Sequence, residues 1–139
     1  MNDINKSLRD AYYSALSSIT FNGSDVNVYE VMPQGADLPA ILLSLQTDTD
    51  DSVKTDFGHD QTILIEVWQD YQGDFGTKDV VDTIANDILN ISIGTGLDLL
   101  PNYKVVTSTL DQSTYLEENL ASVYRIRKQL RIRHRIQEL

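Results

Sequence analysis

Histidine and cysteine side chains carry much of the metal-binding and nucleophilic chemistry of proteins. The 139-residue chain has no cysteine and two histidines, His59 and His134. A zinc site would need carboxylates distant in sequence, and a Ser-His-Asp arrangement would have to use one of these two histidines. Gly94 and Gly96 alone do not make a dinucleotide-binding motif. We predict no enzyme, metal, cofactor or small-molecule substrate, and the alternative in this class is a hydrolase that depends on His59.

A polar stretch between Thr47 and Asp60 contains five aspartates. Its composition resembles part of a calcium-binding loop, but it lacks a glycine and a distal glutamate at EF-hand spacing. The stretch is also longer than a hairpin connection requires. We therefore predict a long, solvated polar loop over residues 47–60, with His59 inside it.

The most regular pattern in the chain lies between Val123 and Ile136. Apolar residues at even positions alternate there with arginines at odd positions. This period of two predicts a long strand, over residues 123–136, with one buried face and one basic face. The arginines are Arg125, Arg127, Arg131, Arg133 and Arg135.

The basic strand contrasts with an acidic body. Before Arg125 the chain has 5 basic and 20 acidic residues, and from Arg125 onward it has 6 basic and 1 acidic. Three interpretations of the arginines stay open: pairing with acids of the same chain, docking to an acidic partner subunit, or contact with nucleic acid. An acidic body does not favour wrapping around nucleic acid, which usually requires a broad basic face. The candidate docking residues are these five arginines together with Asp48, Asp50, Asp51, Asp56 and Trp68.

Two helices and several strands are expected to position these residues. Apolar residues recur at helical spacing over residues 3–18, with Asn2 or Asp3 as a cap, and over residues 77–91, with Thr77 as a cap. Strand patterns occupy residues 26–32, 40–46, 61–68 and 103–110, whereas residues 111–119 are ambiguous. The order predicts one α+β domain over residues 1–139, with a mixed or antiparallel sheet of about four to six strands and both helices on one face. No apolar run approaches the roughly 20 residues that a membrane span requires.

Three segments together resemble the tail-completion or tail-terminator proteins of tailed bacteriophages. They are the stretch from Tyr29 to Leu43 with its two prolines, the strand from Ile63 to Trp68, and the helix from Thr77 to Ile91. In that family an N-terminal helix comes before a short segment of this type, and a strand ending in an aromatic residue comes before a helix packed on the sheet. The resemblance covers most of residues 3–110, and the long arginine-rich strand departs from the usual family pattern.

The resemblance implies a structural virion protein that is assembled in the host cytoplasm. It implies a subunit of a hexameric ring, which closes the head-proximal end of the tail tube and joins it to the connector or neck proteins. DNA would pass through the lumen without sequence-specific binding, and long loops would order against neighbouring subunits. The alternatives are another neck or tail structural protein, or a small nucleic-acid-binding protein that uses the arginine-rich strand.

Overall fold

The structure is a computed structural model, which describes residues 3–53, 57–73 and 75–139. Its helical elements are α1 (Asn5–Leu16), α2 (Asp79–Leu89) and the π-helical turn η1 (Asn90–Thr95), which continues α2. Its strands are β1 (Thr20–Phe21), β2 (Ser24–Asp25), β3 (Asn27–Tyr29), β4 (Ala40–Asp50), β5 (Gly58–Gln72), β6 (Tyr103–Asn119) and β7 (Val123–Glu138).

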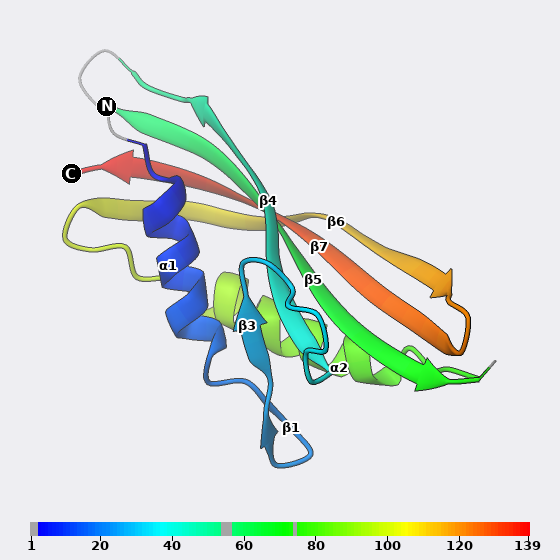
Figure 1. The fold of residues 1–139 in the computed structure, drawn as a ribbon. Coiled ribbons are helices and arrows are strands. Elements are labelled where there is room, and N and C mark those ends of the chain that lie inside the picture. Colours follow the sequence, from blue (N-terminus) through cyan, green and yellow to red (C-terminus); the bar gives the residue numbers. More distant parts are fainter. Residues whose placement is uncertain (1–2, 54–56, 74) are drawn as a thin grey trace.

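Five of the strands form one mixed sheet in the order β3-β4-β5-β7-β6 (Figure 1). All neighbours in this sheet are antiparallel except β3 and β4, which are parallel. The strands β1 and β2 form a separate small hairpin. Its turn residues, Asn22 and Gly23, both have positive φ, of 51° and 79°, as a tight two-residue hairpin turn requires. The predicted α+β class is therefore confirmed.

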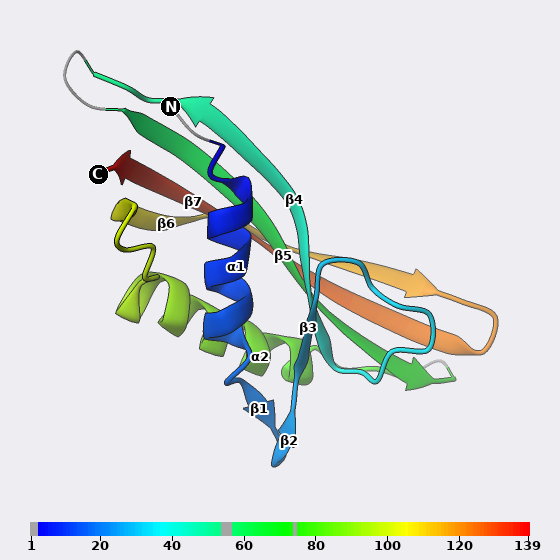
Figure 2. The ribbon, with the colours of Figure 1, turned by 60° about the vertical axis from the view of Figure 1, so that its left-hand side comes forward.

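Both helices cover the same face of this sheet (Figures 1 and 2). Helix α1 buries Leu8, Tyr12 and Leu16, which are four residues apart and so share one side of the helix. Helix α2 buries an apolar stripe of the same kind, made of Val81, Ile84, Ala85 and Ile88. The sheet answers with branched residues that alternate along its strands. They include Ile41, Leu43, Ile63, Ile65, Val67, Ile126, Leu130, Ile132 and Ile136.

Short polar contacts mark the starts of the two helices. The side chain of Asp3 accepts a hydrogen bond from the backbone N–H of Asn5, at 3.0 Å. Thr77 accepts one from the backbone N–H of Asp79, at 3.3 Å. Because free N–H groups at a helix start need acceptors, both contacts favour the observed boundaries. The N-cap residues in the structure are Ile4 and Lys78, and neither makes a side-chain capping hydrogen bond, so the prediction of Asp3 and Thr77 as caps is wrong by one residue in each helix. The third predicted cap, Asn2, lies outside the described residues.

The predicted loop over residues 47–60 is wrong at both ends. Strand β4 continues to Asp50 and β5 begins at Gly58, so the connection spans only residues 51–57. Cross-strand polar pairs extend the hairpin, because Thr47 and Thr62 hydrogen-bond through their hydroxyls and the register pairs Asp50 with His59.

The hairpin also closes tightly at its end. A Cβ atom at position 58 would lie 2.8 Å from the backbone oxygen of Asp51, so this close approach requires glycine. The ambiguous residues 111–119 prove to be strand, because β6 continues to Asn119 beside β7.

Candidate functional site

The face of the sheet opposite the helices carries the arginines of β7. The predicted alternation is confirmed, since Ile126, Leu130, Ile132 and Ile136 are buried and the arginines between them are partly or fully exposed. Strand β7 lies between β5 and β6, so every arginine has cross-strand neighbours on both sides. The acids of these neighbours therefore decide whether each arginine is paired.

Arg125 and Arg133 form two-pronged ion pairs with aspartates of β5. Asp70 lies directly opposite Arg125, whereas Asp60 lies diagonally from Arg133, two residues from the register partner Thr62. Arg125 donates from Nε and Nη2 to the two carboxylate oxygens of Asp70, at 2.8 and 3.1 Å. These hydrogen bonds raise the pKa of Arg125. Arg133 donates in the same way to both oxygens of Asp60, and this holds the pKa of Asp60 below its usual value. Such paired planar groups fix direction as well as charge.

Arg127 lies between two acids and above an aromatic ring. Its guanidinium is 3.0 Å from Glu118 on β6 and 3.6 Å from Glu66 on β5. The ring of Trp68 lies 4.9 Å from the guanidinium carbons of both Arg125 and Arg127. A cation above the face of an indole ring is favourable, so Trp68 stabilises both arginines from the neighbouring strand. We call the arginines of β7, their acidic partners and Trp68 the arginine ladder.

The two remaining arginines of β7 differ, because Arg135 has an acidic partner and Arg131 has none among the described residues. Arg135 donates from Nε and Nη2 to Asp51, at 2.9 and 2.7 Å. Arg131, whose cross-strand neighbours Leu64 and Gln112 are uncharged, has no ion-pair partner among the described residues. Four of the five arginines thus pair within the chain, as the first of the three interpretations expects. Arg131 is the one whose charge is left for solvent or a partner.

A groove of about 330 Å³ opens beside this ladder. It lies between the loop that follows β3, residues 32–38, and the side chains of Trp68, Asp70 and Arg125. Two of the three segments that carried the sequence resemblance, the one around Pro33 and the strand that ends at Trp68, therefore meet at one place in the fold. Trp68 lines the groove from the outer face of the sheet, not from the core.

The aspartates predicted as docking residues do not gather in one place. Asp51 belongs to the arginine ladder, whereas Asp48 lies on the helix side of the sheet beside His59. Asp50 accepts a hydrogen bond from the backbone N–H of Ser52, at 2.9 Å, and hydrogen bonding with the side chain and the backbone of Ser52 lowers the pKa of Asp50. Asp56 lies outside the described residues.

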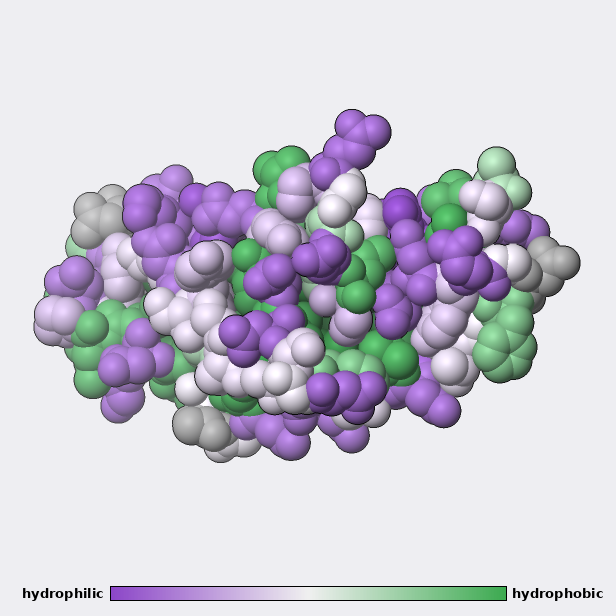
Figure 3. Space-filling view, turned by 60° about the horizontal axis from the view of Figure 1, so that its bottom comes forward, coloured by the Kyte–Doolittle hydropathy of each residue, from purple (hydrophilic) through white to green (hydrophobic). Residues whose placement is uncertain are grey.

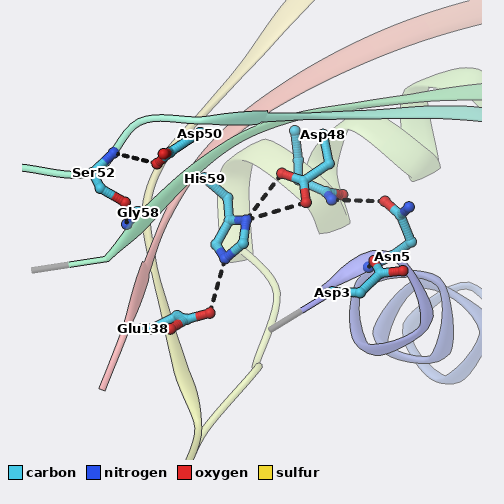
Figure 4. Close-up of polar contacts among 9 residues, drawn as sticks. Asp3, Asn5, Asp48, Asp50, Ser52, Gly58, His59 and Glu138 are labelled. Atoms are coloured by element: carbon cyan, nitrogen blue, oxygen red, sulfur yellow. Dashed lines mark hydrogen bonds and ion pairs between the residues drawn. The ribbon is translucent and has the colours of Figure 1, made fainter. Parts of the chain in front are cut away.

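His59 is buried in a cluster with two carboxylates, although the sequence suggested that it lies in a loop. Its Nδ1 is 2.9 Å from Asp48 and its Nε2 is 3.1 Å from Glu138 (Figure 4). Burial lowers the pKa of His59, but hydrogen bonds with Glu138 and Asp48 raise it, and the net shift is upward. Both ring nitrogens face acceptors, so the charged imidazolium fits best. The cluster ties β4, β5 and β7 together at one end of the sheet.

His134 is also buried but has neutral partners. Its Nε2 is 2.6 Å from the hydroxyl of Tyr12, and its Nδ1 is 2.8 Å from the hydroxyl of Ser108. Burial lowers the pKa of His134 to about 4, so it is uncharged at neutral pH. Within the described residues neither histidine is part of a Ser-His-acid arrangement, and these residues contain no cluster of three or more histidines and acids suited to a metal ion.

Sequence reasoning missed one charged residue on the helix side of the sheet. Lys128 occupies an even position of β7, where the pattern predicts an apolar residue. Its ammonium group is 2.7 Å from Asp82 of α2 and lies 4.8 Å above the ring of Tyr115. The ammonium thus links α2 to the sheet. The signal available in the sequence was a lysine at an even position of β7, where the other residues are mostly apolar.

Figure 3 shows hydrophobic and hydrophilic residues interspersed over one side of the molecule. Across residues 3–53, 57–73 and 75–139, no helix is long and apolar enough to cross a membrane. The five-stranded sheet, the two helices on one of its faces and the arginines of β7 on the other define the class, which is an α+β protein built on one main sheet.

Comparisons with known proteins identify the family within this class. A solved structure described as "Virion of native gene transfer agent (GTA) particle" contains a chain with the same fold, with a TM-score of 0.74 and 20% identity over 99% of each chain. The family model Tail completion protein gp17 matches residues 11–135. The chain therefore belongs to the tail completion protein gp17 family and is a structural protein of the virion tail. No curated protein sequence matches it significantly. The family resemblance predicted from the sequence is confirmed.

Proposed function

We propose that the chain is a subunit of a ring at the head-proximal end of a phage-type tail, where it terminates the tail tube and joins it to the head connector. The observation that carries this proposal is the family match over residues 11–135. The virion origin of the structurally similar chain agrees with it. The ring is a homo-oligomer, hexameric in this proposal, with DNA passing through its lumen.

The charge distribution supports assembly from identical copies. A ring is built from unlike surfaces that meet head to tail, so each copy needs two complementary patches. The chain has a net charge of −10, and the acids Asp25, Asp37 and Asp87 have no ion-pair partner among the described residues. Arg131 is an unanswered cation on the outer face of the sheet. An acidic residue of the next copy would form an ion pair with Arg131.

A nucleic-acid-binding function would use the same arginines, and the structure gives it less support. Four of the five arginines already pair with acids of the same chain. Contact with phosphates would have to replace these pairs, at a cost that a free basic face does not have. We propose likewise that the chain acts by docking and not by catalysis.

Assembly with tail components tests the proposal. The purified chain would be measured by light scattering and negative-stain microscopy, alone and mixed with tail-tube protein. Rings, or caps at one end of tubes, are the expected result. A chain that stays monomeric, ignores tubes and binds DNA would overturn the proposal in favour of the nucleic-acid function.

Two charge-reversal variants separate docking from general electrostatics. Arg131→Glu removes the unanswered cation, and Lys6→Glu changes the net charge equally at an exposed position of α1 that pairs locally with Asp10. We expect Arg131→Glu alone to weaken ring formation, while neither variant changes the free energy of unfolding by more than about 0.5 kcal/mol. Equal effects of the two variants on assembly would exclude a specific role of Arg131.

A further inference from the structure

Strand β6 is the last strand of the five-stranded sheet and pairs with β7 alone (Figure 1). It is 17 residues long, which is unusual for an edge strand. An edge strand presents unpaired N–H and C=O groups, and proteins usually protect such edges with prolines, lysines, bulges or short strands. The presence or absence of such protection along β6 therefore indicates whether this edge is prevented from pairing with another strand.

Only the first half of β6 has such protection. Irregularities in the register with β7 lie between Val105 and Thr107 and between Leu110 and Gln112. From Gln112 to Asn119 the pairing is regular, and this segment contains no proline or lysine. Its two charges, on residues 117 and 118, are answered within the chain by Lys78 at 3.2 Å and by Arg127 at 3.0 Å. We call this segment, residues 112–119, the open edge.

The hairpin at the end of β6 shows which backbone groups of the open edge are free. Leu120 and Val123 donate to each other, at 2.8 and 3.3 Å, and therefore form a hydrogen-bonded pair. Hydrogen-bonded and non-hydrogen-bonded pairs alternate along an antiparallel ladder, and the register continues without a break. Even-numbered residues thus bond to β7. The backbone groups that point away from the sheet belong to Ser113, Tyr115, Glu117 and Asn119.

The opposite side of the same sheet has a second uncovered segment. Strand β3 covers only Ala40–Leu42 of β4. Asp51 donates to the backbone oxygen of Gly58, at 2.9 Å, in register with the pairs from residue 46 to residue 50. Among the described residues, the same alternation leaves the backbone groups of Gln46, Asp48 and Asp50 without a strand partner. The β6 side of the sheet thus offers four outward residues and the β4 side offers three, both at a spacing of two.

We propose that the open edge of β6 in one copy pairs with the Gln46–Asp50 segment of β4 in a second copy, so that the sheet continues across the subunit boundary. This inference rests on the ring function proposed above. A second copy is the occupant because both edges belong to one sheet and offer matching free groups at its two sides. Repeated head-to-tail pairing of this kind closes a ring. Leu116 and Leu120, both about 40% exposed, would be covered beside the new strand pair.

A proline at position 113 tests the pairing. Ser113 is exposed, its side chain has no hydrogen-bond partner among the described residues, and its N–H points away from β7. Proline removes that N–H and is tolerated on an edge strand whose N–H faces solvent. The matched control, Ser113→Ala, keeps the N–H. We expect Ser113→Pro to weaken ring assembly by at least roughly tenfold, because even one interface hydrogen bond of about 1.4 kcal/mol has that effect, whereas Ser113→Ala assembles normally.

Hydrogen exchange in the unaltered protein gives an answer even where the proline variant fails to fold. The amides of Ser113, Tyr115 and Glu117, and those of Gln46, Asp48 and Asp50, should exchange more slowly in rings than in free subunits. Rings that form with Ser113→Pro as readily as with Ser113→Ala, or that leave these amides unprotected, would overturn the edge pairing and leave the ring function standing. Failure of the unaltered chain to form rings with tail-tube protein would overturn the ring function itself.

Discussion

Replacing His59 with glutamine perturbs the cluster that ties β4, β5 and β7 together. Glutamine has a similar size and keeps one donor group, but it cannot carry the positive charge that faces Asp48 and Glu138. The two carboxylates would then face each other with no cation between them. Repulsion and incomplete hydrogen bonding should both reduce the free energy of unfolding.

The size of the effect follows from burial. His59 is 1% exposed, and the side chains of Asp48 and Glu138 are 22% and 12% exposed. Removing one partner of a buried charged pair costs about 3 to 5 kcal/mol. Because solvent reaches Asp48, we expect the lower end, about 3 kcal/mol for His59→Gln near pH 6. In a chain of this size that loss lowers the melting temperature by roughly 10 °C.

The contribution of His59 depends on pH with a defined sign. The pKa of His59 is raised in the folded state, so its stabilisation is fully present below the unfolded value of about 6.5 and is lost as pH rises through the folded value. The other histidine, His134, has a pKa of about 4 in the folded state and remains neutral in this window. The difference in stability between the unaltered chain and His59→Gln should therefore shrink between pH 6 and pH 9.

Urea unfolding of both proteins at several pH values between 6 and 9 measures this difference. Histidine chemical shifts in a pH titration assign the pKa of His59 independently. A variant as stable as the unaltered chain at pH 6, or a difference that grows with pH, would refute the argument that a charged imidazolium holds the two carboxylates.

Three further substitutions test other parts of the structure, each by denaturant unfolding of the monomer. Trp68→Ala should cost about 1 to 2 kcal/mol, because it removes two cation–π contacts of partly exposed arginines. An unchanged free energy of unfolding would show that the indole ring of Trp68 does not stabilise these arginines. Tyr12→Phe should cost about 1 to 3 kcal/mol, because it leaves the buried Nε2 of His134 without its hydroxyl partner. Lys128→Met should cost no more than about 1 kcal/mol, because the pair with Asp82 is partly exposed and the methionine stem packs in its place, and a larger loss would show that the charge itself holds α2 on the sheet.

The regular periodicities in the sequence were sufficient to predict most of the fold. The apolar stripe of α1 and the alternation around Leu130 have one buried side each, so local pattern and tertiary packing agree. The hairpin of β4 and β5 was predicted too short, because its polar ends are stabilised by contacts between distant residues. Asp48 and His59 are 11 residues apart, and Glu138 is 79 residues from His59. No local sequence pattern predicts contacts between residues so far apart in the chain.

The candidate site was predicted in part. The alternation of β7 gave the basic face and the acidic body gave the expectation of pairing, but the partner of each arginine depends on strand order. Arg125 meets Asp70 because β7 lies beside β5, although the two strands are far apart in sequence. The same order places Leu64 and Gln112 beside Arg131, which has no ion-pair partner among the described residues.

The ring function is tested most directly by the mass and shape of the purified chain mixed with tail-tube protein, followed by light scattering and electron microscopy over a range of salt concentrations. We expect closed rings that bind one end of the tubes and stop their growth, and we expect Arg131→Glu to weaken these rings while Lys6→Glu does not. Tubes that grow to the same length with and without the chain, together with a monomer at every concentration, would contradict the ring function.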